Sequence, residues 1–238
     1  MIDLAAERRD LLDQLEQHVD AEYQAGASMV SPTALRVYGV RVPVLQEIAR
    51  DWQRAHKQAT EEEVLGLVEA LWGGPSREER MLALSLLGRY PRYVPRLTWA
   101  HLNRWRRGLD NWELTDHLGV YVLGAWALAD RAARTGHLWE LIDDEDLWSR
   151  RLALVATVWL NRGRQDAAFR DLSLALIDRV KAERHPMITK AVSWALREMI
   201  KQHPDQVAAY LEENRKQLAA HVVREVSNKL RTGLKSGK

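Results

Sequence analysis

The residues of this sequence best suited to chemistry are an indole and a carboxylate, Trp112 and Asp116, which stand four positions apart. Asp110 or Asn111 just before them is a good helix N-cap, and Glu113 stands where a capping side chain can reach back. The spacing therefore predicts that both side chains share one face near the start of a helix. An electron-rich ring beside a carboxylate suits a cationic ligand. A core tryptophan beside a solvated charge is the alternative, and spacing alone favours it.

Two consecutive arginines, Arg150 and Arg151, open a predicted helix over residues 147–161. Cations in a first helical turn oppose the helix dipole, which favours acidic residues there. One explanation is that Arg151 grips a phosphate, since a guanidinium can bind it through two parallel hydrogen bonds. The other explanation is that the acidic run at 143–146 pairs with both arginines.

A second basic stripe follows further along the chain. Lys190, Arg197 and Lys201 stand at spacings of seven and four, and Trp194 belongs to the same side of their predicted helix. A tryptophan flanked by cations suits a sugar–phosphate backbone or a base, and core packing of the ring is the alternative. The stretch 221–238 holds five Lys or Arg and one Glu, which indicates either a basic arm on DNA or a frayed tail.

Composition excludes several other kinds of site. No cysteine occurs among the 238 residues and the eight histidines form no ligand-spaced pair, so we expect no disulfide and no metal. Phosphate-cradling glycine loops and serine-nucleophile motifs are missing, and we expect no cofactor.

The charge is unevenly distributed along the chain. Residues 1–80 hold 9 Lys and Arg against 15 Asp and Glu, whereas residues 81–238 hold 26 against 18. This asymmetry predicts an anionic partner for the C-terminal part.

Almost every segment has the apolar spacing of a helix, and no run alternates with the period of a strand, which predicts an all-α fold. Helices joined by tight turns form either an irregular bundle or a solenoid of stacked pairs, and a pair spacing of about 35–45 residues is typical of HEAT-type repeats. A solenoid would offer a concave face to a ligand. We expect helices near residues 4–26, 43–52, 61–72, 77–90, 95–106, 111–130, 136–143, 147–161, 166–181, 187–202, 205–214 and 217–231.

Four segments, in order along the chain, resemble the DNA alkylation repair proteins built from HEAT-like repeats, the AlkD-like DNA glycosylases. They are Tyr-Gly-Val-Arg-Val-Pro at 38–43, Asn-Trp-Glu-Leu-Thr-Asp at 111–116, Trp-Ser-Arg-Arg-Leu-Ala at 148–153 and Lys-Ala-Val-Ser-Trp-Ala-Leu-Arg-Glu at 190–198. The resemblance implies a right-handed α-solenoid of HEAT-like repeats, one domain over residues 1–238, with a concave, basic DNA-binding face.

The resemblance also implies an activity. The family members with this activity hydrolyse the N-glycosidic bond of positively charged N3- or N7-alkylated purines, such as 3-methyladenine and 7-methylguanine, in duplex DNA without base flipping. In such a mechanism Asp116 is the catalytic carboxylate, Trp112 and Trp194 pack on the sugar and backbone around the lesion, and Arg151 holds a phosphate. The further DNA-binding candidates are Arg150, Lys190, Arg197 and Arg41.

Two positions depart from the family pattern. Glu113 stands where close relatives often carry Asp, and Arg41 stands where the best-known member has an uncharged polar residue.

Two alternatives to a glycosylase remain. The first is a non-catalytic member that binds damaged or branched DNA, and the second, less favoured, is a helical-repeat scaffold for a protein partner. We expect a soluble monomer in the cytoplasm, associated with the nucleoid, with no signal peptide and no membrane-spanning segment.

Overall fold

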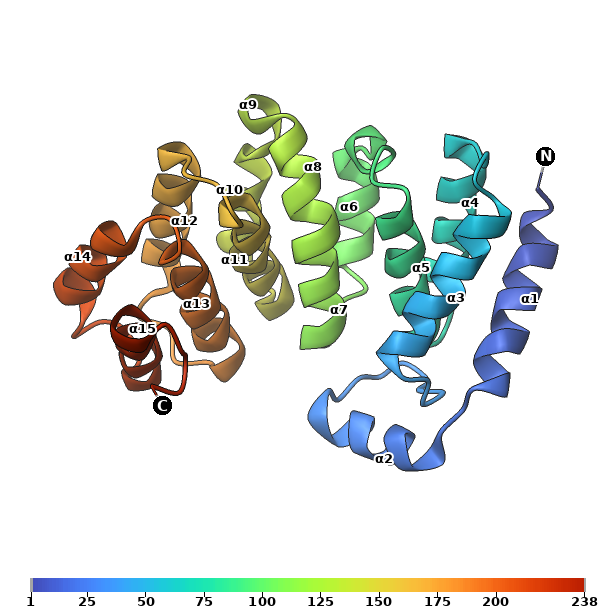
Figure 1. Cartoon of the computed structure of the whole chain (residues 1–238), viewed down its shortest axis with the longest axis horizontal. Coiled ribbons are helices and arrows are strands. Elements are labelled where there is room, and N and C mark those ends of the chain that lie inside the picture. Colours follow the sequence, from blue (N-terminus) through green and yellow to red (C-terminus); the bar gives the residue numbers. More distant parts are fainter. Residues whose placement is uncertain (1, 238) are drawn as a thin grey trace. The chain divides into compact units, whose positions relative to one another are not determined.

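The computed structural model describes residues 2–237, and within that range the regular secondary structure is helical (Figure 1). No strand occurs there, and a single isolated β-bridge pairs Arg36 with Ser76. This confirms the prediction of an all-α fold. The chain divides into two compact units, Met1–Val122 (unit 1) and Leu123–Lys238 (unit 2), and each is described by itself.

Unit 1 is built around α5, which packs against α3, α4 and α7. Helix α4 also contacts α1. A short π-helical segment, η2, follows α7, and the boundary between the units falls near its end. The elements of unit 1 are α1 (Leu4–Gln17), α2 (Ala21–Val30), α3 (Val42–Ala55), α4 (Glu61–Trp72), α5 (Arg77–Arg89), η1 (Val94–Arg96), α6 (Trp99–Arg106), α7 (Trp112–His117) and η2 (Leu118–Leu123).

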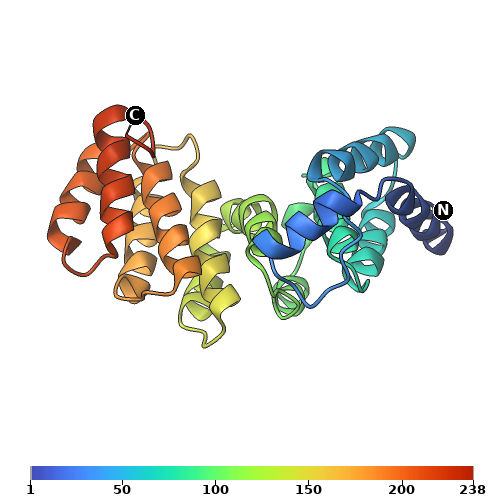
Figure 2. The same cartoon turned by 90° about the horizontal axis from the view of Figure 1, so that it is seen from below.

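Unit 2 has a row of neighbouring helices, in which α11 lies between α8 and α13, and α13 lies between α11 and α15. Figures 1 and 2 both show α11, α13 and α15, gold to dark red, side by side. Helices α10 and α12 contact each other and also pack against α11. The elements of unit 2 are α8 (Gly124–Ala129), α9 (Arg131–Arg134), α10 (Gly136–Ile142), α11 (Leu147–Asn161), α12 (Ala167–Val180), α13 (Pro186–Met199), α14 (Pro204–Asn214) and α15 (Ala220–Thr232).

Local signals set most of these helix starts. Thr60 and Ser76 each form a capping box, in which the side chain of the third helical residue, Glu63 or Glu79, reaches back to the cap. Pro43 lies in the first turn of α3, where its missing N–H is not needed. The sequence predicted each of these starts, and the structure confirms them.

Two predicted helices are interrupted. The helix expected over 4–26 ends at Gln17, because Asp20 caps a new helix by accepting a hydrogen bond from the Tyr23 N–H at 2.9 Å. The helix expected over 111–130 changes to π geometry in η2, a form that occurs often beside functional sites. Within residues 2–237, no helix has both the length and the apolar character needed to cross a membrane.

Candidate functional site

The start of α7 is held by a buried N-cap. Asn111 Oδ1 accepts hydrogen bonds from the N–H groups of Glu113 and Leu114, each at 3.0 Å. The neighbouring carboxylate of Asp110 accepts from Thr33 Oγ1 and from the Ala34 N–H, both at 2.7 Å. The loop before α3 is therefore tied to the first turn of α7.

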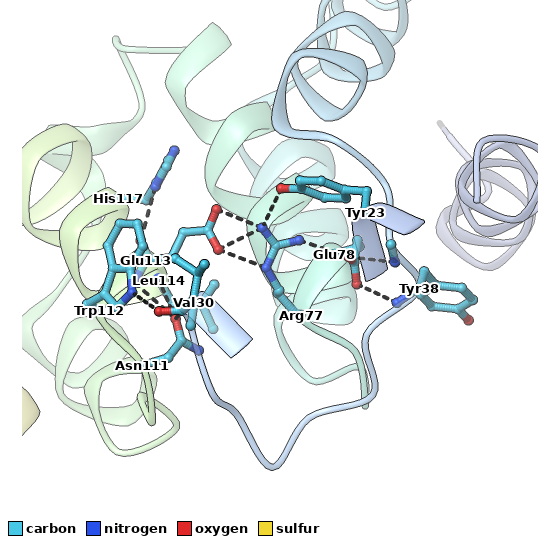
Figure 3. A network of polar contacts seen from close by, with 12 residues as sticks. Tyr23, Val30, Tyr38, Arg77, Glu78, Asn111, Trp112, Glu113, Leu114 and His117 are labelled. Carbon is cyan, nitrogen blue, oxygen red and sulfur yellow. Dashed lines mark hydrogen bonds and ion pairs between the residues drawn. The ribbon is translucent and has the colours of Figure 1, made fainter. Parts of the chain in front are cut away.

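Trp112 and Asp116 both lie on α7, as predicted, one turn apart and half-buried. The indole is oriented by a hydrogen bond from Trp112 Nε1 to the carbonyl of Val30 at the end of α2, at 3.1 Å (Figure 3). Full burial would have supported the interpretation of Trp112 as a core residue. Its partial exposure next to a partly exposed carboxylate instead leaves both groups accessible to a ligand.

Glu113 does not serve as a capping residue, which corrects the expectation from the sequence. Its carboxylate receives a bidentate ion pair from Arg77, with Nε–Oε2 at 2.8 Å and Nη2–Oε1 at 2.7 Å (Figure 3). The Arg77 side chain is only 2% exposed, and its Nη1 also donates to Glu78 Oε1 at 2.8 Å. Although burial acts to lower the pKa of Arg77, the two carboxylates raise it overall, so the guanidinium stays charged.

Glu78 extends this network to the segment 38–43. Its two carboxylate oxygens accept hydrogen bonds from the N–H groups of Tyr38 and Gly39, at 2.9 and 3.1 Å (Figure 3). Gly39 has φ +89°, and a Cβ there would come within 2.7 Å of Asp20 O and 2.6 Å of Gln24 Cβ. Two of the four segments that carry the family resemblance are thus joined through Glu78, Arg77 and Glu113.

A cavity of about 270 Å³ lies between α2 and the start of α7. The buried Arg77–Glu113 pair and the indole of Trp112 contribute to its lining, together with Tyr23 and Val30 from α2 (Figure 3). Sequence reasoning missed this cavity, because Tyr23 and Trp112 are 89 positions apart and only packing brings their elements together. It places a concave, mostly apolar surface against the indole of Trp112, one turn before Asp116 on α7.

A second cavity, of about 260 Å³, lies between α3, α5 and the start of η2. His117 and Tyr121 border it, and their rings are in contact with centroids 5.6 Å apart. Gln46 and Arg89 also line it. His117 follows Asp116 directly, so it is a polar residue near the predicted site that its sequence spacing did not single out.

Arg41 is more than half exposed, but its guanidinium is paired. Its Nε and Nη2 donate to Asp20 Oδ2 at 3.1 and 2.8 Å, and the group lies 4.9 Å from the ring centroid of Tyr23. The Tyr23 backbone N–H, and after it the Arg41 guanidinium, lower the pKa of Asp20. A DNA contact by Arg41 stays a prediction, and it would compete with this exposed pair.

In unit 2, the two arginines of α11 have different surroundings. Arg150 pairs with Glu183 at 3.0 Å, and it also donates to two backbone carbonyls of the acidic run, those of Asp144 and Glu145. Arg151 is 5% exposed and donates through Nη1 to the Met187 carbonyl at the start of α13. This hydrogen bond makes Arg151 a link between α11 and α13.

Helix α13 contains Lys190, Trp194 and Arg197, as predicted, whereas Lys201 lies beyond its end. Lys190 is exposed, and Trp194 is half-buried. Arg197 Nε donates to Ser193 Oγ at 3.2 Å, and burial lowers the pKa of its guanidinium. The described residues, 2–237, contain no cluster of three or more His, Cys, Asp or Glu able to hold a metal ion.

Each unit therefore brings together part of the predicted site. Trp112 and Asp116 share α7 in unit 1, which also contains the ion pair of Arg41 with Asp20. The predicted residues of unit 2 lie on the adjacent helices α11 and α13, which Arg151 links. Rows of stacked helices that mainly contact their neighbours are typical of helical-repeat proteins, which use extended surfaces for binding.

The comparisons with known proteins identify this helical-repeat protein more closely. A family model described as DNA alkylation repair enzyme matches residues 11–230, and the chain belongs to this family. The structure is similar to a predicted DNA alkylation repair enzyme from Enterococcus faecalis, with 20% identity, a TM-score of 0.73, and coverage of 90% of this chain and 98% of that chain. The comparison with curated proteins gave no match.

Two solved structures from Streptococcus mutans are also similar. AlkD2 is 17% identical, with a TM-score of 0.56 and coverage of 90% of this chain and 98% of that chain. The protein smu.31 is 19% identical, with a TM-score of 0.54 and coverage of 80% and 97%. At these identities the likeness shows the fold, and it confirms the predicted helical-repeat architecture. Family membership confirms the predicted DNA repair role and places the chain among DNA repair enzymes.

Proposed function

We propose that this protein is an alkylpurine DNA N-glycosylase that releases positively charged N3- or N7-alkylated purines from duplex DNA without flipping them. The observation that carries this proposal is the pairing of Trp112 with Asp116 at the start of α7. Both are partly exposed, and Trp112 lines a cavity of about 270 Å³. The alkylation repair family supports the choice of substrate.

The chemistry needs little more than these groups. An alkylated cationic purine is already a good leaving group, so no strong general acid is required. As the glycosidic bond breaks, positive charge develops on the deoxyribose, and a fixed carboxylate at Asp116 would stabilise that charge and position the attacking water. The indole face of Trp112 would add a cation–π attraction of about 0.5–2 kcal/mol.

The buried ion pairs support this role because they orient the catalytic helix. Arg77 holds Glu113, which lies between Trp112 and Asp116 on α7. The Asn111 cap and the Val30 carbonyl fix the same turn from two further directions. A carboxylate on a helix held in this way needs little reorganisation when charge develops, which is what electrostatic stabilisation of a transition state requires.

In this proposal the residues of unit 2 bind DNA. Trp194 packs on the backbone near the lesion, and Arg151, which also donates to the Met187 carbonyl, holds a phosphate. Lys190, Arg197 and Arg150 supply further contacts to the phosphates. Arg41 would join them from unit 1 by exchanging its pair with Asp20 for a phosphate.

The test is release of 7-methylguanine from methylated duplex DNA by the purified protein. Asp116→Asn should lower the single-turnover rate about 10²–10³-fold, because it removes the charge that stabilises the transition state. Its affinity for undamaged duplex should stay the same or rise, since one negative charge leaves an anion-binding surface. Asp10→Asn, at an exposed site on α1, is the matched control and should keep full activity.

The possible outcomes separate the candidate functions. Full activity of Asp116→Asn would show that the catalytic assignment is wrong. If neither the native protein nor the variant releases base but both bind DNA tightly, the protein is a non-catalytic DNA-binding member. If neither release nor salt-dependent DNA binding is found, the helical-repeat scaffold for a protein partner is favoured.

A further inference from the structure

Helix α15 and the turn after it fold over residues 220–237, which disagrees with the frayed tail, one of the two interpretations that the sequence left open. Helix α15 is capped by Gly233, whose φ is +75° and whose N–H donates to the Lys229 carbonyl at 2.9 Å. The chain then turns back, and Asn228 Nδ2 donates to the carbonyl of Lys235 at 3.2 Å. The match to the family model ends at residue 230, so this turn lies outside what defines the family.

A cavity of about 410 Å³ lies between α15 and the returning segment. Arg224 is exposed and makes no hydrogen bond or ion pair with another residue in the described part of the chain. The hydroxyl of Ser236 likewise has no partner there. The residues that line the cavity are Arg224, Glu225, Asn228, Leu234, Lys235 and Ser236.

The carboxylate of Glu225 holds two cations, Lys235 and Arg197, near this cavity. Its carboxylate accepts from Ser193 Oγ at 2.6 Å and lies 3.3 Å from Lys235 Nζ and 3.8 Å from Arg197 Nε. Burial alone would raise the pKa of Glu225, but the Ser193 hydroxyl and the two cations lower it overall. One ionised carboxylate thus faces Arg197 and Lys235, with Arg224 also beside it, and the cluster keeps a net charge of two positive.

The cavity is connected to α13 through Glu225, one of its lining residues. The hydrogen bond from Ser193 to Glu225 joins α13 to α15 in the middle of both helices. Arg197, from the α13 stripe, and Lys235, from the returning segment, approach the same carboxylate. A polyanion bound along α13 would therefore meet the positive cluster next.

We propose that this cavity binds a backbone phosphate of duplex DNA, with Arg224, Lys235 and the Ser236 hydroxyl as its ligands. Glu225 and Asn228 are positioning residues, since they hold Lys235 through its ammonium and its carbonyl. Arginine, lysine and hydroxyl groups are the usual donors to DNA phosphates. The inference rests on the proposed function in requiring DNA as the ligand, but it does not require catalysis.

The experiment measures affinity for an undamaged, fluorescently labelled duplex as a function of salt concentration. The slope of log K against log salt falls by about 0.9 for each phosphate that the protein no longer neutralises, and one phosphate corresponds to about five- to tenfold in affinity at 0.1 M salt. We expect this change for the double variant Arg224→Ala/Lys235→Ala, because both side chains serve one phosphate. Lys235→Arg should keep the native slope.

Two variants distinguish a built site from a general loss of charge. Lys216→Ala removes one exposed positive charge from the segment before α15, away from the cavity, and should leave the slope unchanged. Asn228→Ala keeps the charge but releases the carbonyl of Lys235, and should weaken binding. Circular dichroism melting of each variant verifies that α15 remains folded.

Three results would overturn the inference: an unchanged slope in the double variant, an equal loss in Lys216→Ala, or native affinity in Asn228→Ala. Each of these assumes that the native protein binds DNA. Failure of the native protein itself to bind would instead contradict the proposed function.

Discussion

The charged residues around the start of α7 in unit 1 and those exposed on α13 and α15 in unit 2 are used in different ways. At the start of α7 in unit 1, the key charges are buried and paired with each other, with Arg77 2% and Glu113 12% exposed. On α13 and α15 in unit 2, Lys190 and Arg224 are exposed and have no partner in the described part of the chain. Unit 1 holds 15 Lys and Arg against 18 Asp and Glu, whereas unit 2 holds 20 against 15.

This difference indicates a division of labour. A group that acts on a developing charge must be held in one position, and desolvated bidentate pairs give that geometry. Cations that bind phosphates act mainly through charge, which works from a solvated surface and is measured by its salt dependence. The acidic unit therefore carries the proposed chemistry, and the basic unit carries most of the proposed affinity.

The largest effect should come from breaking the buried network of unit 1. Arg77→Met leaves the carboxylates of Glu78 and Glu113 without their cation, and we expect it to lower the free energy of unfolding by about 3–5 kcal/mol. Adding Glu113→Gln should restore part of the loss, because one unpaired charge is removed. Urea denaturation of the three proteins measures both changes.

The matched control lies in unit 2. Arg179 and Asp143 form a comparable bidentate pair at 2.9 and 2.7 Å, but both side chains are about half exposed. Arg179→Met should therefore change stability little, since water replaces the missing partner. Equal losses for Arg77→Met and Arg179→Met would remove the contrast between the two units.

A smaller effect is expected at the backbone of the segment 38–43. Gly39→Ala places a Cβ in a left-handed conformation and against the backbone of α2, so we expect a loss of about 1–3 kcal/mol. Gly26→Ala, in α2 with no atom within 4 Å of the added Cβ, should instead stabilise by about 0.5–1 kcal/mol. Thermal melting compares the stability of the two variants. A gain in stability for Gly39→Ala as well as Gly26→Ala would show that the segment 38–43 does not pack against α2 in this conformation.

The smallest expected effect concerns the caps of the two site helices. Asn111→Ala removes the buried cap of α7, and Asp146→Ala removes the exposed cap of α11, which accepts from the Ser149 N–H at 2.7 Å. We expect losses of about 1–2 kcal/mol for Asn111 and about 0.5–1 kcal/mol for Asp146. The rate of 7-methylguanine release should fall more for Asn111→Ala. A larger loss of stability or of rate for Asp146→Ala than for Asn111→Ala would contradict a more rigid site in unit 1.

Much of the architecture could be predicted from the sequence because its signals are local. The capping residues Thr60 and Ser76 act on N–H groups within three positions, so their helices began where predicted. The end of the first helix and the new start at Asp20 were missed, because helical apolar spacing continues to Val19. Asp20 acts as an N-cap only because the chain changes direction before it. The π geometry of η2 was missed as well, since its residues do not differ in type from those of an α-helix.

The amino-acid sequence by itself determined the all-helical class, most helix bounds, the shared face of Trp112 and Asp116, and the order of segments that indicates the repair family. Tertiary structure alone decided how the charges are paired. Glu113 meets Arg77 from 36 positions away instead of capping its own helix, and Arg151 reaches the carbonyl of Met187 on the next helix of its row. The physical reason is that a cap or a helical face is set within one or two turns of chain, whereas an ion pair forms between whichever charges the packing of helices leaves together away from water.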